Sequence, residues 1–178
     1  MNNQNLIHQL DSQKNLLYSE AQPCKQPLIW MLVLGIAGYI WYSVYHQIIL
    51  GIPFGSKPAP DIILIIIWVI FGVLFPYGLF KARLIIKLNN ENFYYRYFPL
   101  HLNEHSFPIR GIKNIEPVLI RPLFHFGGWG IRYGFKGKGY IMSGGKGIKV
   151  SFNSGRPVYF SAKNADDIVD AFRKAITR

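Results

Sequence analysis

Two apolar runs decide the fold of this chain: LIWMLVLGIAGYIWYSVYHQIIL over residues 28–50 and IILIIIWVIFGVLFPYGLF over residues 62–80. The first run has 23 residues and the second has 19, and neither contains Asp, Glu, Lys or Arg. At about 1.5 Å of rise per residue, each run is long enough as a helix to cross a hydrocarbon core of roughly 30 Å. They therefore predict two transmembrane helices, joined by a short extracytoplasmic loop over residues 51–61.

Prolines and acidic residues mark the ends of these predicted helices. The link over residues 51–61 contains three prolines and two glycines, a composition typical of a tight turn. Asp61 is expected to cap the second helix, because its carboxylate can accept hydrogen bonds from the free N–H groups of the first turn. Pro76 is expected to kink the same helix, because its ring carries no N–H and crowds the preceding turn.

Positive charge is concentrated on one side of the predicted hairpin. The loop carries a single basic residue, Lys57. The basic residues on the other side are Lys14, Lys25, Lys81, Arg83, Lys87 and Arg96. Because cytoplasmic flanks of membrane helices are enriched in Lys and Arg, we expect a multi-pass protein of the cell membrane with both termini in the cytoplasm. Residues 1–27 are polar and are expected to form a cytoplasmic tail.

The hydrophobic period changes after Phe80. Short strand-like segments separated by Gly and Asn turns cover residues 84–88, 93–98, 109–120, 127–133, 139–142, 148–152 and 157–160. Residues 164–177 then show apolar side chains at helical spacing, with acidic residues near the start and basic residues near the end. Residues 81–178 are therefore expected to form a cytoplasmic antiparallel β-barrel or sandwich, capped by a C-terminal α-helix.

Three glycine-containing segments carry a resemblance to a known family: residues 51–61, the run Gly127-Gly-Trp-Gly-Ile-Arg132, and residues 139–147 followed by a strand. They resemble a family of small bacterial membrane proteins catalogued as a domain of unknown function. The resemblance implies an α+β membrane protein in which a two-helix transmembrane hairpin precedes a pleckstrin-homology-like domain. It implies no activity and no cofactor. The expected structural residues of the most specific run are Gly127, Gly128, Trp129 and Gly130.

An alternative function, that of a membrane-associated metal-dependent hydrolase, rests on His101-Leu-Asn-Glu-His105. This segment matches the H-x-x-E-H pattern of certain metalloproteases, in which a helix presents both histidines to zinc and the glutamate polarises water. Here the motif lies between Pro99 and Pro108 and follows a strand-like aromatic run. We therefore expect a loop between two strands, with no metal and no catalytic residues, and keep His101, Glu104 and His105 as the alternative metal ligands.

Basic residues dominate the segment from Arg110 to Arg156, which has nine Lys and Arg against Glu116 alone. Anionic headgroups attract such residues by about 1 kcal/mol each when they are held near a membrane, and the competing interpretation is a solvated surface. No nucleic-acid-binding motif accompanies the charge, so nucleic acid is not an expected partner. The candidates for binding lipid or a partner are Arg110, Lys113, Arg121, Arg132, Lys136, Lys138, Lys146, Lys149 and Arg156.

These features together predict a non-catalytic integral membrane protein that presents a basic module at the cytoplasmic face of the membrane. The chain has a net charge of +11, and residues 81–178, with 17 basic and 6 acidic residues, account for all of it. The expected contacts of this module are anionic lipid headgroups, an unidentified protein partner, or a second copy of the chain.

Overall fold

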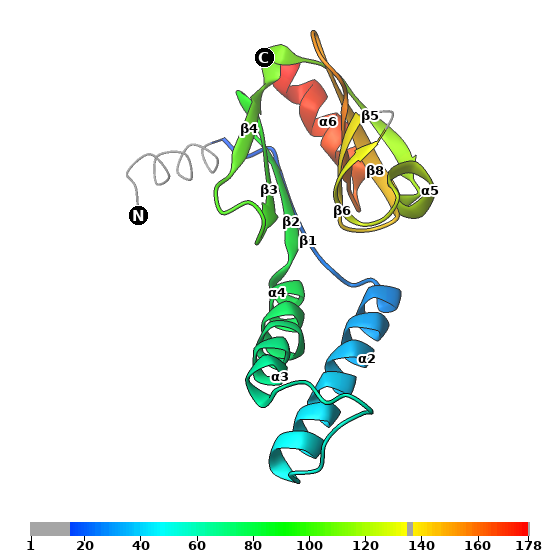
Figure 1. Ribbon diagram of the computed structural model, residues 1–178. Helices are drawn as coiled ribbons and strands as arrows, with labels where there is room; N and C mark the ends of the chain where they lie inside the picture. Colours follow the sequence, from blue (N-terminus) through cyan, green and yellow to red (C-terminus); the bar gives the residue numbers. More distant parts are fainter. Residues whose placement is uncertain (1–14, 135–136, 178) are drawn as a thin grey trace. The chain divides into compact units, whose positions relative to one another are not determined.

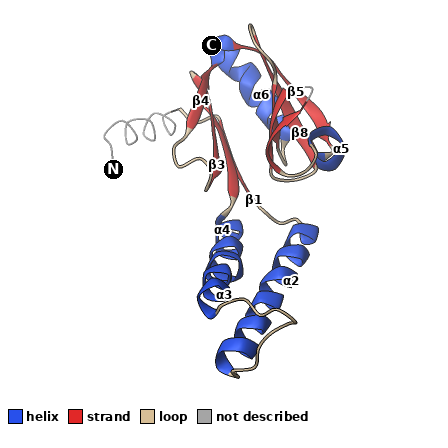
Figure 2. Cartoon of the chain, in the orientation of Figure 1, coloured by secondary structure: helices blue, strands red, loops and turns tan. Residues whose placement is uncertain are grey.

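The computed structural model describes residues 15–134 and 137–177, which divide into two compact units. The helical unit runs from Lys25 to Lys81, and the α+β unit combines residues 15–24 with residues 82–134 and 137–177. Figures 1 and 2 show that the strands belong to the α+β unit and the long apolar helices to the helical unit. The structure therefore confirms an α+β chain with two apolar helices, but the α+β unit is assembled from two separate stretches of sequence.

The helical unit is a hairpin with two arms. The first arm is α2 (Pro27–Val44) continued by the π-helical segment η1 (Tyr45–Ile49). The second arm contains α3 (Asp61–Ile67), the π-helical segment η2 (Trp68–Leu74) and α4 (Phe75–Lys81). The arms have 23 and 21 residues and are long and apolar enough to cross a membrane.

A contact between Trp41 and Gly72 joins the two arms of the hairpin. Trp41 Nε1 donates a hydrogen bond to Gly72 O at 3.1 Å, and the Trp41 ring meets the Trp68 ring edge-on at a centroid distance of 4.9 Å. In a regular α-helix residue 76 would donate to this oxygen, but Pro76 has no N–H. Trp41 therefore supplies a side-chain donor to a carbonyl oxygen to which Pro76 cannot donate. A Cβ on Gly72 would lie 2.9 Å from Trp68 Cδ1, so glycine is required for this packing.

Asp61, expected to cap the second arm, has other surroundings in the structure, and Pro76, expected to kink this arm, lies within its last helix. Asp61 is the first residue of α3 and makes no capping hydrogen bond through its side chain. Its Oδ1 accepts instead from Gln47 Nε2 at 2.7 Å, which links the start of the second arm to the first. Pro76 is the second residue of α4, which directly follows η2, so the helix continues past the proline.

The α+β unit contains two sheets, one with strand order β1-β2-β3-β4 and one with order β5-β8-β9-β7-β6. The strands of the first sheet are β1 (Tyr18–Pro23), β2 (Arg83–Leu88), β3 (Asn92–Phe98) and β4 (His105–Pro108). Those of the second are β5 (Ile112–Ile120), β6 (Gly130–Gly134), β7 (Gly137–Ile141), β8 (Gly145–Phe152) and β9 (Val158–Ser161). The 3-10 turn η3 (Ile109–Gly111) connects the two sheets.

This arrangement corrects two expectations. The sheets do not close into a barrel, because no ladder of hydrogen bonds joins the described strands of one sheet to those of the other. The second sheet is mixed and not purely antiparallel, since β9 pairs with β8 antiparallel but with β7 in parallel. The strand order inserts β9 between the β6–β7 hairpin and β8, and this decides the mixed pairing.

Helix α6 (Ala165–Ile176) packs against both sheets and completes the core, as Figure 1 shows. Its buried residues Ile168 and Phe172 share one apolar cluster with residues of both sheets. The cluster includes Leu84, Ile86 and Leu88 of β2, Ile148 and Val150 of β8, and Phe160 of β9. The apolar residues at helical spacing over residues 164–177 therefore form the buried face of α6 as predicted, except Ile176, which is 59% exposed.

Helix α5 (Pro122–Phe126) covers a smaller apolar cluster in the second sheet. Phe126 packs there with Ile120 and Ile141. A Cβ on Gly139 would lie 2.7 Å from Phe126 Cε1, so the strand can accept this ring only because it has glycine at that position.

Strand β1, which lies in the segment expected to be a polar tail, links the two sheets. It pairs antiparallel with β2, from Tyr18 opposite Leu88 to Pro23 opposite Arg83. Gln22 is only 1% exposed, and its Nε2 donates to Ser161 O at 2.8 Å. Its Oε1 accepts from Ser161 Oγ at 3.3 Å and from Ser143 Oγ at 3.2 Å. A buried amide therefore binds the first sheet to the second.

We expect Gln22→Ala to lower the free energy of unfolding of the α+β unit by about 1–3 kcal/mol, because it leaves buried hydrogen-bonding groups without partners. Ser19→Ala, on an exposed position of the same strand, is the matched control and should change it by less than about 0.5 kcal/mol. Hydrogen exchange of the β8 and β9 amides in the intact, detergent-solubilised protein measures the effect. Equal protection in the two variants would contradict the role of Gln22.

Candidate interaction surface of the α+β unit

Histidines and tyrosines form a cluster between β3, β4 and β7, which we call the His–Tyr cluster. The ring centroids of His101 and His105 lie 4.4 Å apart. Tyr95 stacks on His105 at 5.5 Å, and the hydroxyl of Tyr140 lies 3.4 Å from that of Tyr95. Lys138 Nζ lies 4.9 Å from the centroid of the Tyr140 ring. The cluster therefore connects the edge of the first sheet with β7 of the second.

Burial shifts the pKa values of His101, Tyr95 and Tyr140 in the direction that favours their neutral forms. The pKa of His101 is lowered, first by desolvation and then by the neighbouring His105 and Lys138. Burial raises the pKa of Tyr95 and that of Tyr140. Protonation of His101 would therefore place a charge in a half-buried site that already faces Lys138.

The His101–Glu104–His105 motif does not assemble the donors that the hydrolase alternative requires. The motif occupies a loop and the first residue of β4, not a helix. Glu104 Oε1 accepts from Lys87 Nζ at 2.6 Å, and its side chain is only 6% exposed. Across residues 15–134 and 137–177, no group of three or more His, Cys, Asp and Glu side chains could hold a metal ion. The two histidines thus lack a third ligand of these types in the described chain.

The basic candidates are spread over the second sheet and do not form one patch. Arg110 and Lys113 lie at the start of β5, whereas Arg121 directly follows its end. Because β5 has nine residues at about 3.3 Å each, these groups are roughly 30 Å apart. Arg156 follows the β8–β9 turn, near the start of β5, because Ile112 pairs with Phe152. Lys136 lies outside the described residues.

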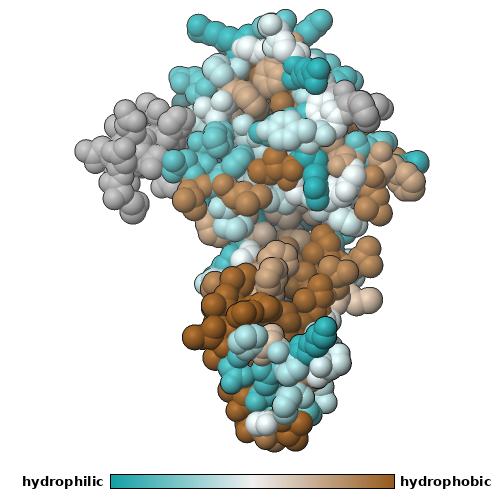
Figure 3. Space-filling model, in the orientation of Figure 1, coloured by the Kyte–Doolittle hydropathy of each residue, from teal (hydrophilic) through white to brown (hydrophobic). Residues whose placement is uncertain are grey.

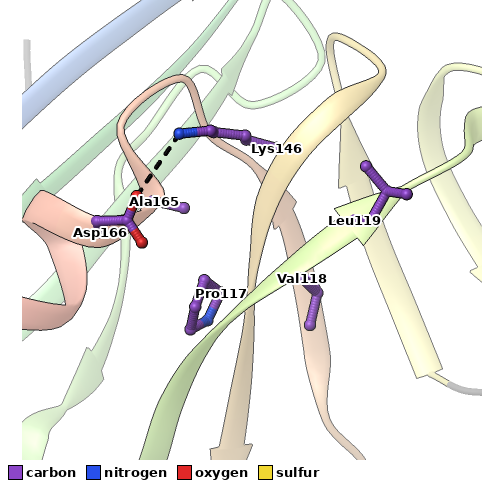
Figure 4. Close-up of a pocket in the computed structure, with 6 residues that line it drawn as sticks. All are labelled: Pro117, Val118, Leu119, Lys146, Ala165 and Asp166. Carbon is purple, nitrogen blue, oxygen red and sulfur yellow. Dashed lines mark ion pairs between the residues drawn. The ribbon is translucent and has the colours of Figure 1, made fainter.

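Two of the candidate lysines pair with carboxylates. Lys149 Nζ lies 2.8 Å from Glu116 Oε1, and this pairing raises the pKa of Lys149. Lys146 Nζ lies 3.6 Å from Asp166 Oδ2 beside a pocket of about 220 Å³ at the start of α6, shown in Figure 4. The other lining residues are Pro117, Val118, Leu119 and Ala165. Since the two charged residues of this pocket pair with each other, it offers no obvious charge to a ligand.

The run from Gly127 to Gly130 forms the turn between α5 and β6. Gly127, Gly128 and Gly130 have φ angles of 69°, 136° and 104°, which side-chain-bearing residues rarely adopt. Trp129 is half-buried against the cluster beneath α5, and its carbonyl oxygen accepts from Arg132 Nε at 2.8 Å. A Cβ on Gly128 would lie 3.4 Å from the Arg132 guanidinium. The glycines thus hold Arg132 against the turn while leaving it exposed.

One end of the α+β unit carries both chain connections to the helical unit, and we call it the linked end. In its register, Pro23 of β1 pairs with Arg83 of β2, and Arg83 pairs with Phe98 of β3. The strand that carries Arg132 lies next to this end. Tyr97, the residue before Phe98, donates through its hydroxyl to Met142 Sδ at 3.9 Å, and Ile141, the residue before Met142, pairs with Gly130 of β6. Burial raises the pKa of this Tyr97 hydroxyl to about 12. Arg83 and Arg132 are therefore exposed cations near the two chain connections.

These observations define the class of protein: an α+β chain in which an apolar helical hairpin interrupts a two-sheet unit between its first and second strands. The chain belongs to the family of unknown function DUF6141, whose model matches residues 11–178. No significant match was found among curated proteins or among solved structures. The matched region includes β1, both helical arms and α6, so the family model describes both units together.

The lowered pKa of His101 predicts that acid destabilises the His–Tyr cluster. Because the folded pKa lies below the unfolded one, the unfolded state binds more protons as the pH falls below about 6.5, and stability falls with it. We expect His101→Gln to show a smaller drop in melting temperature between pH 7.5 and pH 5 than the parent. His125→Gln, on an exposed position of α5, is the control. An unchanged drop in His101→Gln would contradict the assignment.

Proposed function

We propose that this chain is an integral membrane protein with both termini in the cytoplasm, whose α+β unit is a non-catalytic, pleckstrin-homology-like module that contacts anionic lipid headgroups. The observation that carries the proposal is the exposure of large apolar side chains along both arms of the helical unit. Met31 is 72% exposed and Ile62 71%, and Figure 3 shows hydrophobic residues gathered over this unit. Such a surface is stable when lipid covers it.

The architecture of the α+β unit supports the pleckstrin-homology-like part of the proposal. Two packed sheets followed by a C-terminal helix correspond to the sandwich form of that plan. The helix contributes Ile168 and Phe172 to the core shared by the sheets. In the part of the chain that the structure describes, the His101–Glu104–His105 motif is held by Lys87 and by aromatic stacking. This supports an interaction module over an enzyme.

Chain connectivity supports a lipid contact at the linked end. Arg83 is two residues from Lys81, the last residue of α4, so their Cα atoms are at most about 7 Å apart. This limit holds for any orientation of the α+β unit. Arg83 and Arg132 take part in none of the ion pairs found among the described residues. They are therefore available to headgroup phosphates, which attract each Lys or Arg by about 1 kcal/mol near a membrane surface.

The proposed membrane topology predicts that the intact protein stays in the membrane pellet after an alkaline carbonate wash. Protease added to inverted vesicles should cut the α+β unit and leave the loop from Gly51 to Pro60 intact. In right-side-out vesicles, the protease should cut this loop and leave the α+β unit intact. Release by carbonate, or cleavage of the loop from the cytoplasmic side, would reject the topology.

The proposed lipid contact predicts that Arg83→Gln/Arg132→Gln loses bound anionic lipid. At about 1 kcal/mol per residue, the double variant should retain roughly thirtyfold less phosphatidylglycerol relative to phosphatidylcholine after purification from mixed bilayers. Mass spectrometry of the co-purified lipid measures this ratio. The matched control is Arg110→Gln/Lys113→Gln at the start of β5. An equal ratio in both double variants would remove the lipid contact and leave a protein partner or a second copy.

A further inference from the structure

We infer that the loop between β3 and β4 inserts Leu100 and Leu102 into the bilayer interface, giving the α+β unit an apolar membrane contact of its own. This inference rests on the proposed insertion of the helical unit in a membrane. It adds a site that the charge of the chain does not reveal, because the loop is neither basic nor part of an apolar run.

Leu100 and Leu102 are the most exposed leucines in the described part of the α+β unit, ahead of Leu119 at 60%. Leu100 is 67% exposed and Leu102 74%, whereas Leu84 and Leu88 of β2 are fully buried. The residue between the two leucines, His101, turns into the His–Tyr cluster and is half-buried. The loop therefore presents two leucines outward on either side of an inward anchor.

Hydrogen bonds hold this loop in place at both ends. His101 N donates to Tyr97 O at 2.7 Å, which closes the turn after β3. Glu104, the last residue before β4, accepts from Lys87 of β2 at 2.6 Å. A loop fixed in this way loses little conformational entropy when its leucines bind a surface, which favours insertion.

The register of the first sheet places this loop at the linked end. Phe98 pairs with Arg83, which is two residues from the end of α4, and Leu100 is two residues beyond Phe98. The path from Lys81 to Leu100 therefore consists of two residues to Arg83, one inter-strand spacing to Phe98 and two further residues. This path limits the distance between the Cα atoms of Lys81 and Leu100 to roughly 20 Å. Since Lys81 ends a membrane-length helix, this limit lets the leucines reach the headgroup layer.

The chemistry around the loop favours lipid over a protein partner. Exposed leucines two and four residues beyond Phe98, the partner of Arg83, place apolar side chains near a cation, the combination that binds interfacial lipid: apolar side chains at the acyl boundary and basic side chains at the phosphates. We therefore propose the cytoplasmic leaflet of an anionic bilayer as the binding partner of this loop.

Fluorescence of a single label in the full-length protein tests this inference. Cys24 is the only cysteine, so Cys24→Ser allows one new cysteine to be labelled with the environment-sensitive dye NBD. Leu102→Cys places the dye on the loop, and Ser154→Cys places it in the β8–β9 turn as the matched control. In vesicles of phosphatidylcholine and phosphatidylglycerol, the dye at position 102 should show blue-shifted emission and at least twofold quenching by nitroxide-labelled lipid. The dye at position 154 should show neither.

The outcomes separate this inference from the proposed function. If both dyes report water while the protein resists carbonate extraction, loop insertion is wrong and the membrane topology stands. A blue shift at position 102 without quenching by nitroxide lipid would assign the loop to a protein surface or a second copy, and would also overturn the inference. Release of the protein by the carbonate wash would reject both the membrane topology and the insertion of the loop. Leu100→Cys repeats the measurement, and circular dichroism establishes that each labelled variant is folded.

Discussion

The pairing of β1 with β2 is the constraint on which the rest of this structure depends. The chain completes β1, leaves for the helical hairpin, and returns as β2 with Pro23 opposite Arg83. Because paired strands lie about 5 Å apart, the two ends of the hairpin must start and finish close together. The side chain of Gln22 in β1 then donates a hydrogen bond to Ser161 O, which joins this pair of strands to the second sheet. A fragment beginning at Lys81 would lack β1 and leave the buried groups around Ser161 without their partner.

This connectivity gives the proposed membrane module a defined attachment. The α+β unit is joined to the helices by three residues between Pro23 and Pro27 and by one residue between Lys81 and Arg83. Two such short links restrict the reach of the unit much more than a single flexible linker would. In the proposed lipid contact, weak interactions of individual basic or apolar side chains act together, because the links keep them at a high effective concentration near the surface.

The candidate surface was only partly predictable from the sequence. The basic residues could be identified from the sequence. Their distribution over the surface could not, because the register of β5 with β8 decides which ends of the strands meet. The motif His101–Glu104–His105 was expected to be a loop, yet its packing against Tyr95 and Tyr140 depends on contacts between the sheets. The sequence did not indicate Leu100 and Leu102 as contact residues, since two isolated leucines in a short loop form no hydrophobic period.

The sequence by itself determined the elements whose burial follows a local repeat: the two apolar helices, the strands β2 and β8, and the amphipathic helix α6. Tertiary structure alone decided that the sheets stay open, that β7 and β9 are parallel, and that the polar segment Tyr18–Pro23 is a strand. The physical reason is that a hydrophobic period reports how one segment is buried. The burial of Gln22 is stabilised by hydrogen bonds to Ser143 and Ser161, more than 100 residues away in the chain.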